Sequence, residues 1–140
     1  MAFTGNYACN AFRVGLLNGA YNFSTGTYYI ALYTNAATLD YTTAAYTSTG
    51  EVVATGYTAG GNPLTVTVTP TTGSSTSTTA YISFGNTTWN AALTARGALI
   101  YQQGGSAVCV LDFGNDKTSS SIFTVQFPAS TTTSAIIRLS

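Results

Sequence analysis

The sequence predicts an all-β protein, an antiparallel jelly roll or β-sandwich of about eight strands with one short N-terminal helix. Apolar and β-branched runs are separated by Gly, Pro, Asn and Thr turns along most of the chain. One run, 64–69, alternates strictly between apolar residues and threonine, which is typical of a half-exposed strand. Beyond the first twenty residues, no helical pattern is long enough to cross over between parallel strands. We therefore expect one domain, 1–140, made of a helical segment, 1–20, and a β-sandwich, 27–140.

The first twenty residues differ from the rest because their apolar positions recur near the helical period, at Ala8, Ala11, Phe12, Leu16 and Ala20. Asn6 is the expected N-cap, and Asn18-Gly19 supplies a stop. The pattern predicts an amphipathic helix of about three turns. Two roles are open for this helix: it covers one edge of the sheets, or it is an arm that docks on a neighbouring subunit.

The strands are expected at 27–33, 51–55, 64–69, 80–84, 98–101, 107–111, 122–127 and 135–139. Pro70 is expected to end the third of them, because proline cannot donate to a strand ladder. Residues 38–50 have no sustained period and predict a long ordered loop, of the kind that usually carries a contact or a function. The polar run 71–79 predicts a mobile hairpin tip, and 114–117 predicts a turn.

The stretch 96–113 is the expected centre of the fold. Two nearly continuous apolar runs flank a glycine-containing linker, which indicates a hairpin whose strands are covered on both faces. Symmetry about Gly104 would place Leu99 opposite Cys109, Ile100 opposite Val108 and Arg96 opposite Asp112. The last two residues are therefore expected to form a structural ion pair.

The charge content is unusually low. Charged residues make up 6% of the chain and the formal net charge is zero, whereas 27 threonines contribute polar surface. Four scattered basic residues offer no footprint for phosphate backbones, so direct nucleic-acid binding is not expected. No apolar run is long enough for a signal peptide or a membrane span, and we expect a product that is synthesised in the cytoplasm and contacts no membrane. Weak mutual repulsion favours packing into an assembly.

The sequence offers little catalytic chemistry. The absence of histidine removes the commonest general base and the commonest transition-metal ligand, so no enzyme activity, metal or other cofactor is expected. Asp112 and Asp116 flank a turn and are interpreted as turn residues, because a glycosidase pair or a calcium loop would need more ligands or a cleft. The distant Cys9 and Cys109 are expected to be free, mostly buried thiols.

Aromatic and apolar side chains are the other candidates for function, because ten Tyr, seven Phe and one Trp are many for this length. Trp89, in a turn-rich segment, is either a plug at the core edge or an interface anchor. The candidate interface residues come from the helix, the 38–50 loop and this segment: Phe3, Tyr7, Phe12, Leu16, Tyr41, Tyr46 and Trp89.

Several motifs together resemble a known family. They are Y-Y-I-A-L-Y-T, T-G-E-V-V-A-T-G-Y-T-A-G-G, I-S-F-G-N-T-T-W, T-A-R-G-A-L-I-Y and V-L-D-F-G-N-D-K, preceded by the N-terminal helix. Over nearly the whole chain they resemble the capsid cement, or decoration, proteins of tailed phages, as found in a Bordetella podophage. The resemblance implies a non-enzymatic jelly-roll protein on the outer surface of the virion head. There it would tie major capsid protein subunits together, and it brings no catalytic motif.

A neutral, threonine-rich β-protein suits this role, because many weak contacts repeated by symmetry give a large total. The expected partners are the phage major capsid protein and a second copy of the chain, in a homodimer or another symmetric oligomer. The alternative hypothesis is a tail- or fibre-associated adhesin, or carbohydrate-binding module, that uses exposed tyrosines and Trp89.

Overall fold

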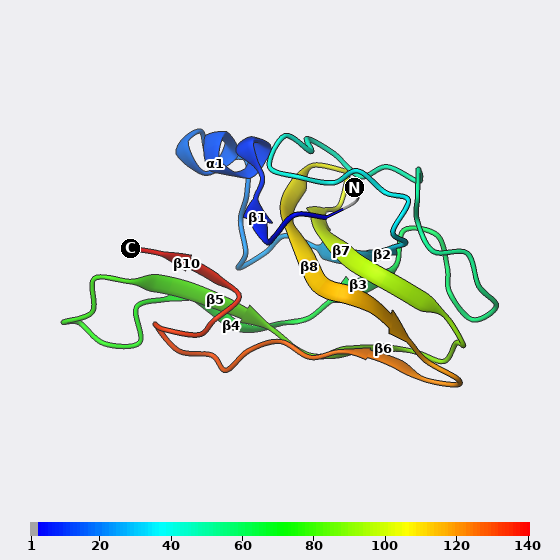
Figure 1. Cartoon of the computed structure of the whole chain (residues 1–140). Coiled ribbons are helices and arrows are strands. Elements are labelled where there is room, and N and C mark those ends of the chain that lie inside the picture. The colour runs from blue at the N-terminus through cyan, green and yellow to red at the C-terminus, as the bar shows by residue number, and fades with distance from the viewer. Residues whose placement is uncertain (1–2) are drawn as a thin grey trace.

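Residues 3–140 are described by a computed structural model, in which ten strands form three antiparallel sheets beside one short helix (Figure 1). The largest sheet has the order β1 (Tyr7–Ala8), β8 (Ala107–Thr118), β7 (Thr94–Gln102), β2 (Tyr28–Tyr33) and β3 (Asn62–Leu64). A three-stranded sheet has the order β10 (Ile137–Leu139), β5 (Ala80–Phe84) and β4 (Val66–Thr71). β6 (Thr87–Trp89) and β9 (Phe123–Val125) form a two-stranded sheet. The all-β class with one short helix is confirmed, but the strand count of eight was too low.

Several expected element boundaries are wrong. The segment 51–55 is not a strand. It forms one isolated bridge, between Tyr33 and Glu51, because it is part of a loop that covers the large sheet. β3 forms instead at Asn62–Leu64 and overlaps only the first residue of the expected strand 64–69. Pro70 lies inside β4 and does not end it. β4 is an edge strand, where the missing N–H of proline breaks no ladder bond.

The helix α1 (Asn10–Leu17) is shorter than the sequence predicts. The N-cap position belongs to Cys9 and carries no side-chain cap, because the two preceding residues pair with β8 as the strand β1. Asn6 therefore caps no helix, and its Oδ1 accepts a hydrogen bond from the backbone N–H of Asp112 at 2.7 Å. The expected C-terminus is correct: Asn18 is the C-cap and Gly19 has φ 76°, a left-handed conformation that favours glycine.

The central hairpin is formed by β7 and β8, but its register differs by one residue from the symmetric expectation. Leu99 pairs with Val110 and Ile100 pairs with Cys109, because an irregularity between Ile100 and Tyr101 shifts the register beside the connecting turn. A second irregularity lies beside Gly97. Residues 114–117, which were expected to form a turn, are part of the strand β8.

Arg96 lies at this second irregularity, while its neighbour Gly97 pairs with Asp112. The Arg96 side chain nevertheless forms an ion pair with Asp112, and its guanidinium lies 5.7 Å from the ring centroid of Phe3. Asp112 Oδ1 also accepts the N–H of Gly114. Burial raises the pKa of Asp112, but the bonds from Gly114 and Arg96 outweigh burial and leave this pKa below its usual value.

One face of the large sheet packs on the smaller sheets, which lie below it in Figure 1. The Tyr28 ring stacks on Phe23 at 4.4 Å between centroids and lies 6.3 Å from Phe84 of β5. At the other end of this layer, Trp89 of β6 lies 6.3 Å from Phe123 of β9. Apolar contacts of this kind join the sheets into one core.

The opposite face is covered by the long loop between β2 and β3, residues 34–61. Tyr101 of β7 stacks on Tyr29 of β2 at 5.7 Å and on Tyr46 of the loop at 4.9 Å. Its hydroxyl donates a hydrogen bond to the Gly60 carbonyl at 2.6 Å. With both faces covered, Leu99 at the centre of β7 has no exposed surface.

Glu51 holds this loop together. The carboxylate is buried and accepts three hydrogen bonds, from the Tyr57 hydroxyl at 2.7 Å, the Gly60 N–H at 2.7 Å and the Tyr46 hydroxyl at 2.6 Å. Burial, together with the bond to Glu51, raises the pKa of Tyr46 to about 12, so Tyr46 stays a proton donor. The Tyr57 hydroxyl in turn accepts the N–H of Leu32 in β2, which ties the loop to the sheet.

Glu51→Gln should lower the free energy of unfolding by about 2 kcal/mol, because an amide loses the charge and one of the acceptor atoms that serve three donors. Urea denaturation at neutral pH measures this change. The matched control Asp116→Asn alters an exposed carboxyl and should stay within about 0.5 kcal/mol of the wild type. Equal effects of the two substitutions would contradict the role given to Glu51.

Candidate functional site: an apolar groove beside the helix

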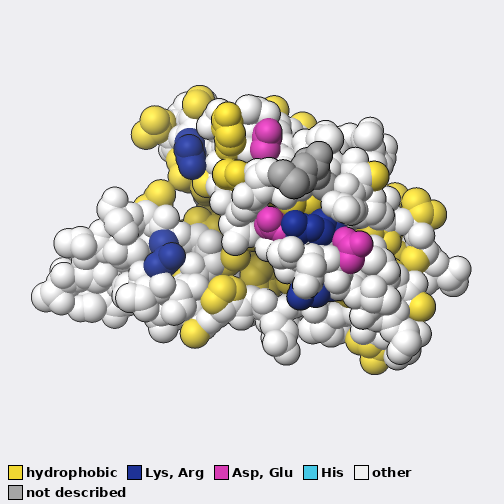
Figure 2. Space-filling model, viewed as in Figure 1, with side chains coloured by type: hydrophobic (Ala, Val, Ile, Leu, Met, Phe, Trp, Pro, Cys, Tyr) yellow, Lys and Arg dark blue, Asp and Glu magenta, His cyan; other side chains and the backbone are white. Residues whose placement is uncertain are grey.

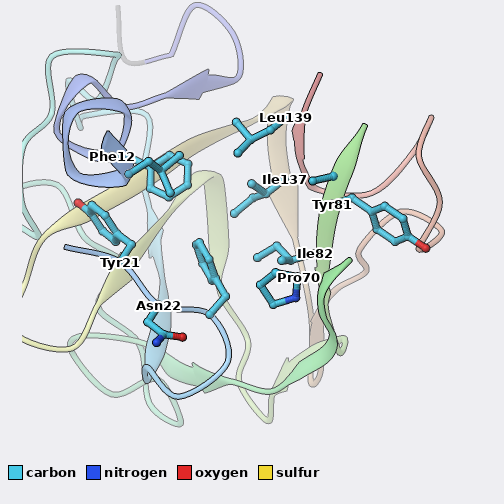
Figure 3. A pocket seen from close by; sticks show the side chains of 11 residues that line it. Phe12, Tyr21, Asn22, Pro70, Tyr81, Ile82, Ile137 and Leu139 are labelled. Carbon is cyan, nitrogen blue, oxygen red and sulfur yellow. The ribbon is translucent and has the colours of Figure 1, made fainter. Parts of the chain in front are cut away.

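An apolar groove of about 230 Å³ opens between α1, the segment after it and the three-stranded sheet (Figure 3). Its walls come from distant parts of the chain: Phe12, Leu16, Tyr21, Asn22, Phe23, Pro70, Ala80, Tyr81, Ile82, Ile137 and Leu139. In Figure 3 the helix residue Phe12 faces Ile137 and Leu139 across the hollow. The groove therefore lies where the helix and the lower layer meet without filling the space between them.

The helix forms one wall because its sequence is apolar on more than one side. Phe12 is buried, and Leu16 is half-buried at the groove. Gly15 allows the Tyr21 ring to pack against the helix, since a Cβ at this position would lie 2.2 Å from that ring. The remaining apolar side chains point outward, with Val14 62% and Leu17 92% exposed. A helix with exposed apolar side chains is typical of a contact surface.

The other wall is formed by the three-stranded sheet. Pro70 comes from β4, Ile82 from β5, and Ile137 and Leu139 from the C-terminal strand β10. Leu139 is 54% exposed at the rim. We define the helix-side surface as this groove together with Val14, Leu17 and Leu139. Its chemistry suits the binding of apolar side chains.

Two polar side chains that line the groove are already engaged in the fold. The Tyr21 hydroxyl donates a hydrogen bond to the Ala107 carbonyl at 2.8 Å, and burial raises the pKa of Tyr21. Asn22 Oδ1 accepts the N–H groups of Ser24 and Thr25 within its own turn. The groove is therefore lined mainly by apolar side chains, which suits the binding of apolar groups.

Three of the interface residues proposed from the sequence are buried inside the chain. Phe3 is 2% exposed, because it lies beneath Arg96 and against Gly97. Phe12 is 3% exposed among Tyr21 and Phe23, and Trp89 is 3% exposed between Tyr57 and Phe123. Phe3 and Trp89 pack inside the core, so their assignment as surface anchors is wrong. Phe12 is also nearly fully buried, but its ring forms part of the groove wall.

The other four proposed interface residues reach the surface at least in part. The ring centroids of Tyr7 and Tyr41 lie 5.8 Å apart, and Tyr41 is 48% exposed. Leu16 lines the groove, whereas Tyr46 is held at Glu51 on the opposite face of the large sheet. Tyr7 and Tyr41 are therefore in ring contact, whereas Tyr46 is bound within the loop that covers the large sheet.

Sequence reasoning missed Leu17, Val14 and the wall formed by β10. The helical pattern of 8–20 contains Val14 and Leu17 as apolar positions outside the inward-facing stripe, and this excess was the available signal. Ile137 and Leu139 gave no such signal, because only the fold brings the C-terminal strand to the helix.

The cysteines do not form a reactive pair. Cys9 and Cys109 are buried and free. Ala8 is the ladder partner of Cys109, so Cys9, the next residue, lies on the opposite face of the sheet. Burial raises the pKa of Cys9 to about 11 and also raises that of Cys109. Both therefore stay thiols at neutral pH and pack as small apolar side chains.

Other kinds of site find little support within residues 3–140. No group of three or more His, Cys, Asp or Glu side chains is placed to hold a metal ion in this part of the chain. The Asp40 carboxylate accepts the N–H and the hydroxyl of Thr42, and these bonds lower its pKa. Within the same residues, α1 is too short to cross a membrane.

Comparison of the chain with models of protein families, with curated proteins and with solved structures finds no match.

Leu139→Ser should weaken the binding of the apolar dye 1-anilinonaphthalene-8-sulfonate by about fivefold, because it removes roughly 1 kcal/mol of apolar contact from the groove rim. Fluorescence titration measures the dissociation constant. Val53→Ser removes an exposed apolar side chain outside the groove and serves as the control. Equal dye binding by the two variants would show that the groove is not the binding surface.

Proposed function

We propose that this protein is a non-enzymatic structural protein of a phage virion, which binds the outside of the capsid and cements contacts between major capsid protein subunits. The observation that carries the proposal is the helix-side surface, where an apolar groove adjoins Val14 and Leu17 on an exposed helix. The resemblance of the sequence motifs to tailed-phage cement proteins supports the same role. Such a surface gains free energy when a partner covers it.

The carboxylates support a non-enzymatic role. Glu51 accepts hydrogen bonds within the loop, Asp112 is paired with Arg96, and Asp40 bonds to Thr42. Each of these three side chains therefore has a structural partner. Asp116 is the fourth and is exposed. General acid–base chemistry would need two such groups held across a substrate cleft.

A symmetric oligomer fits this role. The chain has no net charge, so copies repel each other weakly. Two copies related by a twofold axis would present the helix-side surface twice, and a capsid offers the matching contacts many times. Modest affinity at each contact is then enough for a stable shell.

We also propose that the fold is a jelly-roll sandwich of two layers. Aromatic side chains in the core hold the layers together, and one side of the sandwich is open. The five-stranded sheet supplies one layer, and the three-stranded and two-stranded sheets together supply the other. An open side leaves strand edges available to neighbouring proteins in an assembly.

The alternative function, a tail- or fibre-associated adhesin or carbohydrate-binding module, has less support. Sugar stacking needs exposed aromatic faces, but Trp89 is buried. Among residues 3–140, Tyr41 is the only aromatic residue whose side chain is exposed rather than buried or half-buried. A single exposed tyrosine ring is a small platform for a glycan.

Particles that lack the protein should release their DNA at a lower temperature than wild-type particles, because cementing contacts resist internal pressure. Added wild-type protein should restore the release temperature. The Leu17→Asp variant should bind these particles about tenfold more weakly, since a charge replaces an apolar contact. Sedimentation of labelled protein with the particles measures this binding.

The control for this experiment is Val53→Asp, which places the same charge at a 96% exposed position outside the helix-side surface. It should bind like the wild type. An unchanged DNA-release temperature in particles without the protein would reject cementing, and equal binding by the two variants would reject the helix-side surface as the contact.

A further inference from the structure

β8 of the upper layer and the C-terminal segment of the lower layer lie on the same side of the molecule (Figure 1). A groove of about 520 Å³ lies between β1, α1 and β8 on one side and residues 134–139 on the other. A second groove, of about 610 Å³, lies further along β8, between Phe113, residues 117–120 and β9. We call these two grooves together the seam.

Strand edges border the seam. β1 is the last strand of the five-stranded sheet, and β10 is the last strand of the three-stranded sheet. An outermost strand has one row of N–H and C=O groups without a strand partner. β1 pairs with only two residues of β8, Cys109 and Val110. The seam therefore offers open backbone edges beside apolar surface, which is the arrangement that accepts an added strand from another chain.

The charges that line the seam have one sign. Arg13 and Arg138 line the first groove and Lys117 lines the second, while no Asp or Glu lines either groove within the described chain. The fourth basic residue, Arg96, is paired with Asp112. Figure 2 shows Lys and Arg colour on the upper body, where Asp and Glu colour lies beside it, and on the arm at the lower left, which carries no Asp or Glu colour in this view. The three other basic groups therefore line the grooves of the seam, two in the first and one in the second.

We propose that the seam binds an extended acidic segment of a partner protein, which adds as a strand to the free edge of β10. Alternate apolar side chains of that segment would cover Ile137, Leu111 and their neighbours in the groove, and its carboxylates would face Arg13 and Arg138. The inference rests on the proposed function for the identity of the partner, a capsid protein, but the seam itself is defined by this chain alone.

A second copy of this chain does not fit the seam. Of its four carboxylates, Glu51 is buried, and Asp40 and Asp112 are engaged at their own sites. The C-terminal segment after Asp116 contains no Asp or Glu. The chain thus has no extended acidic segment of its own to offer, so the charge of the seam favours a different protein.

The test uses blocked peptides of about ten residues that alternate valine with glutamate, or valine with lysine, so that one face is apolar in both. The glutamate peptide should bind the intact protein about tenfold more tightly than the lysine peptide, measured by fluorescence anisotropy. It should also slow amide hydrogen exchange in β10 by about tenfold at the N–H groups that point away from β5, because a new strand covers this free edge.

Two controls separate strand addition from simple charge attraction. A glutamate peptide that is N-methylated at alternate residues keeps its charges but lacks half of its backbone donors, and it should not protect β10 from exchange. Arg138→Gln should weaken binding of the unmodified peptide by about fivefold, whereas Arg138→Lys should retain it. Arg138 is exposed, so both variants should fold.

Equal binding of the glutamate and lysine peptides would overturn the inference, and so would unchanged exchange at β10. A free protein that sediments as a dimer with β10 already protected would assign the seam to a second copy and also overturn it. These results are independent of the particle experiment. Loss of heat resistance without peptide binding would reject only the seam, whereas peptide binding with unchanged heat resistance would reject only the cementing role.

Discussion

The fold depends on burying both faces of the central strands β2, β7 and β8. Ala98, Leu99 and Ile100 in β7 have no exposed surface. Their continuous apolar sequence requires cover on both sides, since any exposed face would lose the hydrophobic free energy of that side. The smaller sheets supply one cover and the loop 34–61 supplies the other. The loop is an effective cover only because Glu51 satisfies its buried polar groups from within.

The same constraint leaves the remainder of the chain available for contact. Once the two covers are in place, α1 and β10 are attached at the periphery and do not close against each other. The groove between them keeps apolar walls, and Leu17 keeps an almost fully exposed side chain. Along the adjoining seam, strand edges stay open and Arg13 and Arg138 stay close to them. A protein that works between other proteins gains from such surfaces, because its partners can complete them.

Several strands could be predicted from local sequence patterns, but contacts between residues that are distant in the sequence could not. The continuous apolar runs correctly predict β7 and β8, because both faces of these strands are covered. The alternation of apolar residues and threonine correctly predicts β4, because only one face of this strand is covered. Asn6 was wrongly predicted as an N-cap, because its side chain bonds instead to the backbone of Asp112 in β8, which is 106 residues away in the sequence. Aromatic content could not separate the buried Trp89 from the exposed Tyr41. Nothing near Glu51 in the sequence indicates three donors, and Leu139 meets α1 only in the folded chain.

The central claim is that the protein is a repeated part of a phage head, and its copy number per particle tests this most directly. Quantitative mass spectrometry of purified virions, with the major capsid protein as internal reference, measures the ratio of the two chains. Cementing between capsid subunits requires a ratio fixed by icosahedral symmetry, with copies on the order of hundreds per particle. A handful of copies per particle, or none, would contradict the account and place the protein in a tail or outside the virion.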